Sequence, residues 1–266
     1  MKVLFVGDIV GRRGRKVVRR MIPALRRKND IDLIIANVEN SAGGFGITPR
    51  VAREILAMGV DVMTSGNHIW DKKEVLQCID DEPRLLRPHN YPPGVPGRGA
   101  YQGVTDQGVR YGVLNLQGRV FMPNIDCPFR CAEEQVSRLR KRTQVLIVDF
   151  HAEATSEKLA LGWSLDGKVS AVLGTHTHVP TADTRLLPKG TAYVSDVGMT
   201  GCYDSVIGVS VQTALPRFLT AMPTRFAGAT GLASLASVLL DIDEATGLAR
   251  SIERIGPDLP TGCSGG

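Results

Sequence analysis

Three short apolar segments, each followed by a stretch of helical character, open the chain and limit its fold more than any other feature. The spacing of apolar residues predicts strands at 2–7, 33–38 and 60–64, and helices at 14–28, 49–58 and 71–81. Thr48-Pro49 marks one helix start, because threonine is a good N-cap and proline suits the first helical position. This alternation of strands and helices is typical of an α/β domain.

The remainder of the chain continues the pattern and then changes character. We expect strands at 100–104, 111–116, 144–150 and 170–174, and helices at 131–142 and 156–163. Short strands at 181–187, 191–195 and 206–211 are expected to add to a second sheet in antiparallel fashion, followed by a hairpin at 237–255. The chain is interpreted as a single domain, 1–266, with a loose tail at 256–266.

Polar residues follow each of the first three expected strands. Asp8 comes after the first, Glu39 and Asn40 after the second, and Asn67 and His68 after the third. Ligands of α/β sheets bind in the crevice outside the carboxyl ends of the strands. A capping or turn role explains any one of these positions but explains all three poorly, so we expect a site there.

Histidine has an uneven distribution in this chain. Of five histidines, four lie at the ends of expected strands: His68, His151, His176 and His178. The last two follow the strand 170–174. Because side chains in a strand alternate between its faces, residues two apart point the same way, and we expect these two imidazoles to form a pair at a metal site.

The kinds of ligand in this set favour certain metals. Carboxylates, amide oxygens and imidazoles without a thiolate favour Mn, Fe or Mg, and they also permit Zn. Eight such groups are too many for one tetrahedral site, and they suit two metal ions that share a carboxylate. The eight are Asp8, Glu39, Asn40, Asn67, His68, His151, His176 and His178.

The net charge of +5 has a local origin. Nine Lys or Arg residues and no acid lie between Arg12 and Lys28. The first interpretation is the solvated face of an amphipathic helix, with Val17, Val18 and Leu25 on its apolar side. The second is a positive field that attracts phosphate esters or RNA. The two are compatible.

The cysteine pattern and the hydropathy indicate the cellular compartment. Five cysteines at 78, 127, 131, 202 and 263 are widely spread, so reduced, non-catalytic thiols are expected in preference to a structural zinc site. The longest uncharged stretch, 226–240, has 15 residues, fewer than a membrane span needs. The start of the chain has no signal-peptide core. These features predict a cytoplasmic protein without a membrane partner.

Several motifs together resemble a known family. They are Gly7-Asp8, Glu39-Asn-Ser-Ala-Gly-Gly-Phe-Gly-Ile-Thr48, Gly66-Asn-His-Ile-Trp-Asp71, Asp149-Phe-His-Ala-Glu-Ala-Thr-Ser-Glu-Lys158, Gly174-Thr-His-Thr-His178 and Asp196-Val-Gly-Met-Thr-Gly201. In this order they resemble the calcineurin-like metallophosphoesterase superfamily, and more closely its YmdB-like bacterial branch. The chain departs from the superfamily pattern at two places, and both departures resemble the YmdB-like branch. Val10 stands where the superfamily has a histidine, and Glu39-Asn40 stands where it has Gly-Asp-x-x-Asp.

The resemblance implies a four-layer α/β/β/α sandwich of two mixed sheets flanked by helices. It also implies two divalent metal ions, Fe or Mn first, with Mg or Zn as alternatives. The first ion would be held by Asp8, Glu39, Asn40 and His178, and the second by Glu39, Asn67, His151 and His176, with Glu39 bridging. A hydroxide between the ions would attack phosphorus, and His68 would donate a proton to the leaving oxygen.

The implied activity is a phosphodiesterase acting on a small phosphoester, a 2′,3′-cyclic nucleotide in the first place. The alternatives are a phosphomonoesterase and a non-catalytic RNA-binding or regulatory protein that retains the metal site, and a homo-oligomer is expected. Among neighbouring residues, Trp70 is expected in the core, Glu153 and Thr155 beside His151, and Asp196 and Asp204 in structural roles.

Overall fold

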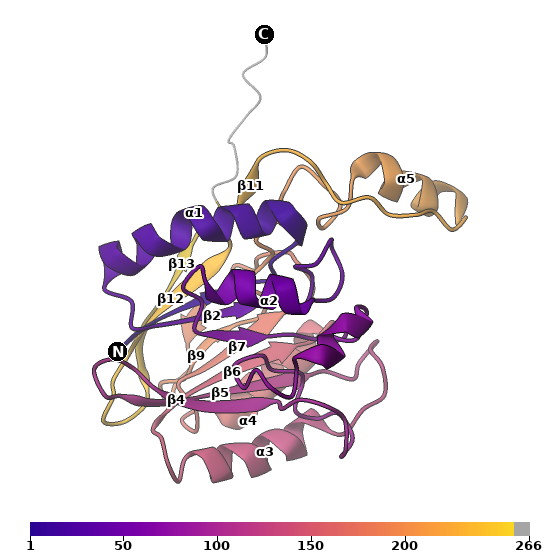
Figure 1. Cartoon of the computed structure of the whole chain (residues 1–266). Helices are drawn as coiled ribbons and strands as arrows, with labels where there is room; N and C mark the ends of the chain where they lie inside the picture. Colours follow the sequence, from indigo (N-terminus) through magenta and orange to yellow (C-terminus); the bar gives the residue numbers. More distant parts are fainter. Residues whose placement is uncertain (258–266) are drawn as a thin grey trace.

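The computed structural model describes residues 1–257, and these form four layers (Figure 1). Two mixed β-sheets pack face to face. Helices α1 (Gly11–Asn29) and α2 (Pro49–Leu56) cover the outer face of one sheet, and α3 (Pro128–Leu139) and α4 (Thr155–Leu165) cover the outer face of the other. The α/β/β/α sandwich expected from the resemblance is therefore confirmed. The tail predicted to be loose lies, from residue 258 on, outside the described residues.

The first sheet has five strands in the order β13-β12-β1-β2-β3. Strands β1, β2 and β3 are parallel, and β12 lies antiparallel to β1 on one side and to β13 on the other. The hairpin expected at 237–255 is thus confirmed. The strands are β1 (Lys2–Val6), β2 (Leu33–Asn37), β3 (Val62–Thr64), β12 (Ser237–Ile242) and β13 (Ala249–Ile255).

The second sheet has six strands in the order β4-β5-β6-β7-β9-β8. Strands β5, β6, β7 and β9 are parallel, whereas β4 and β8 are antiparallel edge strands. The strands are β4 (Ala100–Val104), β5 (Arg110–Gln117), β6 (Val145–His151), β7 (Ala171–Thr175), β8 (Arg185–Leu186) and β9 (Ala192–Val194). The antiparallel expectation is right for the pairing of β8 with β9, but β9 lies parallel to its other neighbour, β7.

The hydrophobic core has three parts that match the layers. Phe5 and Ile35 of the first sheet pack against Ile147 and Leu173 of the second, and all four are fully buried. Separate apolar clusters lie between each sheet and its own helices. Burial on both faces explains why the parallel strands are continuous apolar runs in the sequence.

Two local predictions are wrong. The helix expected at 71–81 is a 3₁₀ helix, η1 (Lys73–Gln77), within a run of turns. The strand expected at 206–211 does not form. Ile207 (φ 46°) and Gly208 (φ 97°) have left-handed backbone conformations, so Val206 and Val209 turn back on each other.

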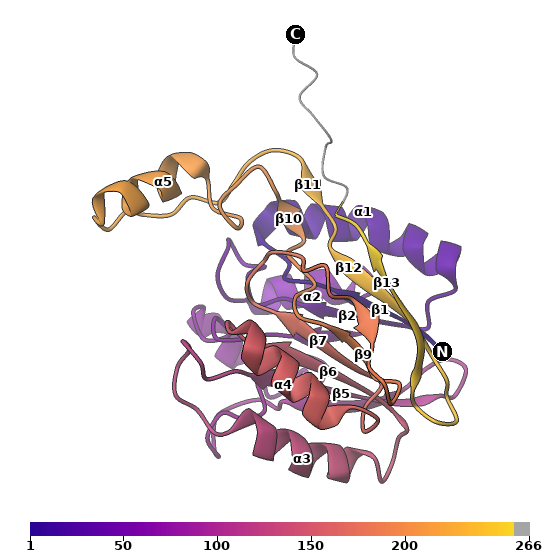
Figure 2. The same cartoon turned by 180° about the vertical axis from the view of Figure 1, so that it is seen from behind.

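Helix α5 (Val211–Thr220) follows that turn and projects from the body (Figure 2). Its chain leaves and returns beside the short ladder of β10 (Gly201–Cys202) and β11 (Ala233–Ser234). We call residues 205–232 the arm. The sequence pattern does not predict this helix, because Pro216 lies within it.

No helix among residues 1–257 is long and apolar enough to cross a membrane.

Candidate metal centre

The parallel strands of both sheets end at one common edge, and the expected site residues follow those ends. Asp8 comes two residues after β1, Glu39 two residues after β2, and Asn67 three residues after β3. His151 is the last residue of β6. Face-to-face packing of the sheets brings these ends together in a crevice, as expected for ligands of α/β sheets.

His151 lies at the centre of the cluster. Its Nε2 atom is 3.1 Å from Glu39 Oε1, 3.1 Å from Asn67 Oδ1 and 3.0 Å from His176 Nδ1. Ligand atoms of Glu39, His151 and His176 all lie within 4.8 Å of one another. A ring nitrogen carries at most one hydrogen, so it cannot donate to all three neighbours, and a cation would satisfy these lone pairs together.

Asp8, Asn40 and His178 form the adjoining part of the site. Asn40 Oδ1 is 3.4 Å from His178 Nε2, and Asp8 Oδ2 accepts a hydrogen bond of 3.3 Å from the backbone N–H of His176. The other oxygen, Asp8 Oδ1, is buried and accepts no hydrogen bond from the described residues. A buried carboxylate oxygen without a donor is costly unless a cation compensates it.

This donor set fits a divalent cation. It combines two carboxylates, two amide side chains and three imidazoles without a thiolate, which favours borderline to hard ions. The structure thus brings together the seven residues that the sequence analysis assigned to metal binding. They are Asp8, Glu39, Asn40, Asn67, His151, His176 and His178.

The histidine pair is positioned differently from the way we expected. Strand β7 ends at Thr175, so strand alternation does not orient His176 and His178. Both have positive φ angles, 103° and 66°, which non-glycine residues rarely adopt. Such conformations cost about 1–3 kcal/mol each and persist only where surrounding contacts enforce them. The turn, rather than the strand, turns both imidazoles towards the same cavity.

Asp196 supplies those enforcing contacts. Its Oδ2 atom accepts hydrogen bonds from the backbone N–H (3.0 Å) and the hydroxyl (2.8 Å) of Thr177, the residue between the two histidines. The same oxygen forms a buried ion pair with Lys158 Nζ at 2.8 Å. The structural role expected for Asp196 is therefore supported by its contacts, whereas Asp204 is exposed.

A buried chain of hydrogen bonds orients His151. Its Nδ1 is 2.9 Å from the Thr175 hydroxyl, which donates to Asp149 Oδ1 at 2.8 Å. Asn37 donates to the other oxygen of Asp149 at 3.0 Å. The hydroxyl gives its one proton to Asp149, so it accepts from Nδ1–H, and Nε2 faces the cluster.

The sequence analysis assigned this supporting role to other residues, and it was wrong. Thr155 begins α4 and is exposed, and Glu153 contacts His176 Nε2 at 3.1 Å instead of His151. Asp149 lies two positions before His151 on β6, and Asn37, the last residue of β2, lies two positions before Glu39. A polar residue at that spacing, inside an otherwise apolar strand, is the signal that could have identified them.

Burial and neighbouring charge shift the pKa values of this cluster in opposite directions. Burial would raise the pKa of Glu39, but His151 and His68 outweigh it and lower the pKa to about 2. Burial opposes the charge of His151, yet Glu39, Asp8 and Asp149 raise its pKa to about 9. Burial, and then the charge of His151, lowers the pKa of His176 to about 3.

The two fully buried aspartates behave alike. Burial raises the pKa of Asp149 to about 7, although His151 and hydrogen bonds act against it. Burial also raises the pKa of Asp8 against the attraction of His178 and His151. Groups that carry shifted pKa values in one crevice are typical of functional sites.

His68 lies at the rim of the centre. Its backbone N–H donates to Glu39 Oε2 at 3.0 Å, and its Nδ1 is 2.8 Å from Asp71 Oδ2. A carboxylate only accepts, so Nδ1 carries the hydrogen and Nε2 is left available. The sequence analysis did not single out Asp71, although its position three residues after His68, at the end of Gly66–Asp71, was a signal.

A cavity of about 310 Å³ opens above the centre. Its polar side combines side chains of the centre with His68, and its apolar side comes from the loop after β2 and from the base of the arm. The lining includes Glu39, Asn40, Phe45, His68, His176, His178, Ile207, Val209 and Phe226. Trp70 does not line it and packs against the core instead, as expected.

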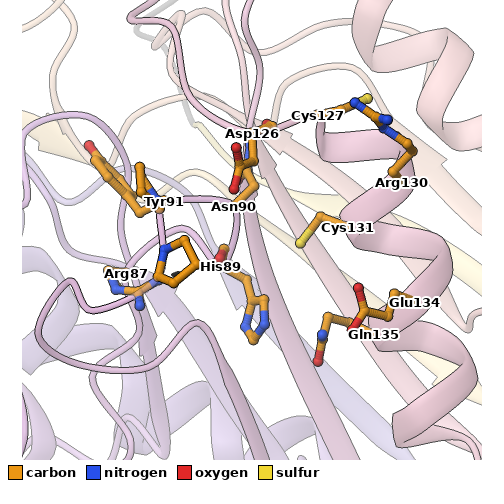
Figure 3. Close-up of a pocket in the computed structure, with 12 residues that line it drawn as sticks. Arg87, His89, Asn90, Tyr91, Asp126, Cys127, Arg130, Cys131, Glu134 and Gln135 are labelled. Carbon is orange, nitrogen blue, oxygen red and sulfur yellow. Dashed lines mark hydrogen bonds between the residues drawn. The ribbon is translucent and has the colours of Figure 1, made fainter.

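A larger cavity, about 430 Å³, lies elsewhere, between residues 87–93 and helix α3 (Figure 3). It contains His89, Cys127 and Cys131 but none of the candidate metal ligands, so size alone does not identify the site. Cys78, Cys127, Cys131 and Cys202 are free thiols, as expected; Cys263 lies outside the described residues.

Comparison with known proteins assigns the chain to a family. A family model described as YmdB-like protein matches residues 4–255. The chain belongs to the YmdB-like family. A relative from Bacillus subtilis (strain 168), named 2′,3′-cyclic-nucleotide 2′-phosphodiesterase, is 51% identical over 255 residues, which cover 96% of each chain.

Solved structures resemble this YmdB-like chain over almost its full length. A hypothetical protein from Thermus thermophilus is 44% identical with a TM-score of 0.90, and the match covers 96% of this chain and 98% of that one. A structure described as a novel phosphatase from Mycoplasma pneumoniae is 33% identical with a TM-score of 0.90, over 96% and 92% of the two chains. The fold and the family are thus those expected from the sequence motifs.

Proposed function

We propose that the protein is a metal-dependent phosphodiesterase that opens 2′,3′-cyclic nucleotides. The observation that carries the proposal is the convergence of Glu39, His151 and His176 below a cavity large enough for a small ligand. The 51% identity with the Bacillus phosphodiesterase supports the substrate class. The match covers almost all of both chains, so it includes every candidate metal ligand of this chain.

The proposed ligand sets follow the two halves of the cluster. One ion would take Asp8, Glu39, Asn40 and His178, and the other Glu39, Asn67, His151 and His176. The short distances around His151 and the unpartnered Asp8 Oδ1 support both sets. We infer Fe or Mn, with Mg or Zn as alternatives, from the mixed oxygen and nitrogen donors. Two such ions would make a coordinated water acidic and neutralise the phosphoryl oxygens.

His68 is the proposed proton donor to the leaving oxygen. Asp71 accepts a hydrogen bond from Nδ1–H of His68. This bond orients the ring and leaves Nε2 free to exchange a proton with the substrate. Both the ring of His68 and the side chains of the centre line the same cavity, so a phosphoester bound there would lie within reach of each. No covalent intermediate with the chain is required.

Hydrolysis assays test the proposal. The protein, with Mn added and after chelation, is given 2′,3′-cyclic AMP, bis-p-nitrophenyl phosphate and 3′-AMP. Metal-dependent turnover of the first two, with little release of phosphate from the third, is expected. Preference for 3′-AMP would identify a phosphomonoesterase. If no divalent metal supports turnover of any of the three compounds, the enzyme hypothesis is wrong and a binding protein is the remaining alternative. His68→Ala should keep its metal content and lose activity about 10²- to 10⁴-fold.

Contact with RNA is a second candidate role. Arg12 and Arg13 line a small cavity that shares Val10, Gly43 and Gly44 with the cavity above the centre. Positive charge beside the site would attract further phosphates of a chain that ends in the cyclic group.

Two other basic residues of α1 are already paired, because Arg15 and Arg19 both form ion pairs with Glu54. Only the start of this helix, at Arg12 and Arg13, is therefore expected to contact RNA. An oligoribonucleotide ending in a 2′,3′-cyclic phosphate should bind more tightly than the mononucleotide, and Arg12→Gln/Arg13→Gln should abolish that difference. Equal affinity of the wild-type protein for the oligoribonucleotide and the mononucleotide would rule out this contact with RNA.

We also propose that the chain forms a homo-oligomer through the arm. Helix α5 has one buried residue, Ala214, and a ten-residue helix is marginal in water without tertiary packing. Three of its exposed apolar residues are spaced 4 and 3 apart, the spacing of the seam between paired helices. They are Val211, Leu215 and Phe218.

A second copy of this chain offers the same seam, and a two-fold axis makes the seam self-complementary. The arm contains two arginines, Arg217 and Arg225, and no acid, and Asp204 lies just before it. Binding of α5 to a different, acidic partner is therefore the competing outcome. Light scattering should give more than the monomer mass, and Leu215→Glu/Phe218→Glu should reduce it to the monomer. A monomeric wild-type protein would exclude this oligomer.

A further inference from the structure

Two phenylalanines line the apolar side of the cavity above the metal centre. Phe45 comes from the glycine-rich loop between β2 and α2, and Phe226 comes from the returning segment of the arm. Phe45 is 39% exposed although it is a large apolar residue. Exposed aromatic rings beside a polar centre are typical of a surface that contacts a ligand.

The environments of both rings leave aromatic surface for a ligand. The Phe45 ring packs on His68, with centroids 5.0 Å apart and planes tilted by 59°. Arg217 lies over the ring of Phe226, 5.0 Å from its centroid, and Phe226 also lines the cavity. The space beside the rings is open, since a Cβ at Gly43, Gly44 or Gly228 would meet nothing within 4 Å.

The polar side chains of the cavity are otherwise engaged. Apart from His68 and the candidate ligands, they are Glu153, which contacts His176, and Thr177, whose hydroxyl donates to Asp196. The described lining therefore offers aromatic faces to a ligand but no uncommitted side chain to form hydrogen bonds with the edge of a base.

We propose that Phe45 and Phe226 form a nucleobase subsite that holds the base by stacking on its face. This inference rests on the proposed function, since the phosphate of the same nucleotide would bind at the centre. Stacking is tolerant of base identity because every base has a π face. The subsite should accept all four 2′,3′-cyclic nucleotides, with purines favoured over pyrimidines by their larger area.

Kinetics with matched substrates test the subsite. The metal-loaded protein is compared on 2′,3′-cyclic AMP and on 1-O-methylribose 2′,3′-cyclic phosphate, which lacks the base. Phe45→Leu and Phe226→Leu should each raise KM for cyclic AMP roughly five- to hundredfold and leave the abasic compound unchanged. Phe45→Tyr should retain the wild-type KM. Phe121→Leu, a change at a phenylalanine that is 90% exposed and does not line the cavity, is the matched control.

Two outcomes overturn the subsite. If both Leu variants keep the wild-type KM for cyclic AMP, no ring contacts the base. If the Leu variants raise KM equally for cyclic AMP and for the abasic compound, the rings do not act on the base, and Phe45 acts through its contact with His68.

A binding measurement separates this inference from the proposed function. By calorimetry, 3′-AMP should bind the metal-loaded protein more tightly than ribose 3-phosphate, and the Leu variants should remove the difference. If wild-type protein turns over no cyclic phosphate but still shows this difference, the activity is wrong and the subsite stands. Equal binding of the two probes to wild type rejects the subsite, whatever the activity.

Discussion

The carboxylate of Asp196 accepts two hydrogen bonds from Thr177 while its charge is balanced by Lys158. This contact holds the turn that carries His176 and His178. We expect Asp196→Asn to lower metal content and to destabilise the protein by about 3 kcal/mol or more, because Lys158 would be left buried without a counter-charge. Metal analysis and thermal unfolding check this.

The double variant Asp196→Asn/Lys158→Met is the matched comparison. Replacing both charges removes the unpaired ammonium, so it should recover part of the lost stability. It should not recover metal content if the carboxylate is needed to hold the turn. An unchanged melting temperature in Asp196→Asn would contradict the prediction.

Gly66 lies against the ring of His151. A Cβ at this position would be 2.1 Å from His151 Cδ2 and 2.2 Å from Nε2, closer than any real contact. Gly66→Ala should therefore displace the imidazole and lose bound metal. Gly228→Ala, where a Cβ meets nothing within 4 Å, is the control and should keep its metal. Full metal occupancy in Gly66→Ala would show that the ring is not held where the structure has it.

The Thr175 hydroxyl joins His151 to Asp149. Thr175→Val removes this link at similar volume, and we expect metal affinity to fall about 10- to 100-fold because the ring loses its fixed orientation. Thr175→Ser retains the hydroxyl and should stay close to wild type. Competition with a chelator measures both affinities, and equal values for the two variants would refute the link.

Asp71 orients His68 without contacting the candidate metal ligands. Removing its hydrogen bond by Asp71→Ala should lower kcat roughly tenfold to hundredfold while metal content stays constant. Asp71→Asn keeps an acceptor for Nδ1–H and should lose less. Steady-state kinetics beside metal analysis test this, and loss of metal in Asp71→Ala would mean that the residue supports the centre itself.

Cys127 and Cys131 lie four residues apart but differ as acids. Backbone N–H groups of Arg130 and Phe129 at the start of α3 lower the pKa of Cys127, whereas burial raises the pKa of Cys131 to about 11. Only the thiolate reacts with iodoacetamide. As pH rises from 6, Cys127 should be labelled first, and Cys131 should stay protected until strongly alkaline pH. Peptide mapping by mass spectrometry gives both profiles, and equal rates would contradict the prediction.

Much of the fold follows from local patterns in the sequence. Strands β1, β2, β5, β6 and β7 are long apolar runs because both their faces are buried, and Thr48-Pro49 defines the start of α2, where the threonine side chain accepts from Val51 N–H. Residues after these strands must meet at one edge, because parallel strands end on the same side. Asp8, Glu39, Asn67 and His151 could therefore be assigned to one crevice from the sequence.

Other features depend on contacts between distant segments. The turn at His176 and His178 adopts positive φ angles that no local preference predicts, because Asp196 and Asp8 hold it from elsewhere in the chain. The 206–211 segment has the apolar residues of a strand, yet it folds back on itself and leads to α5.

The sequence by itself determined which chemical groups this protein offers and at which end of its strands they lie, since apolar runs mark the buried strands and the intervening helices indicate parallel strands. Only the tertiary structure decided how those groups are oriented. The supporting residues Asp149, Thr175 and Asp71, and the ring of Phe226, act through hydrogen bonds and packing between segments far apart in the chain or across a turn. The free energy of such contacts exists only when the layers are assembled, so a local pattern can mark a residue such as Asp149 or Asp71 as a candidate but cannot identify the partner that it orients.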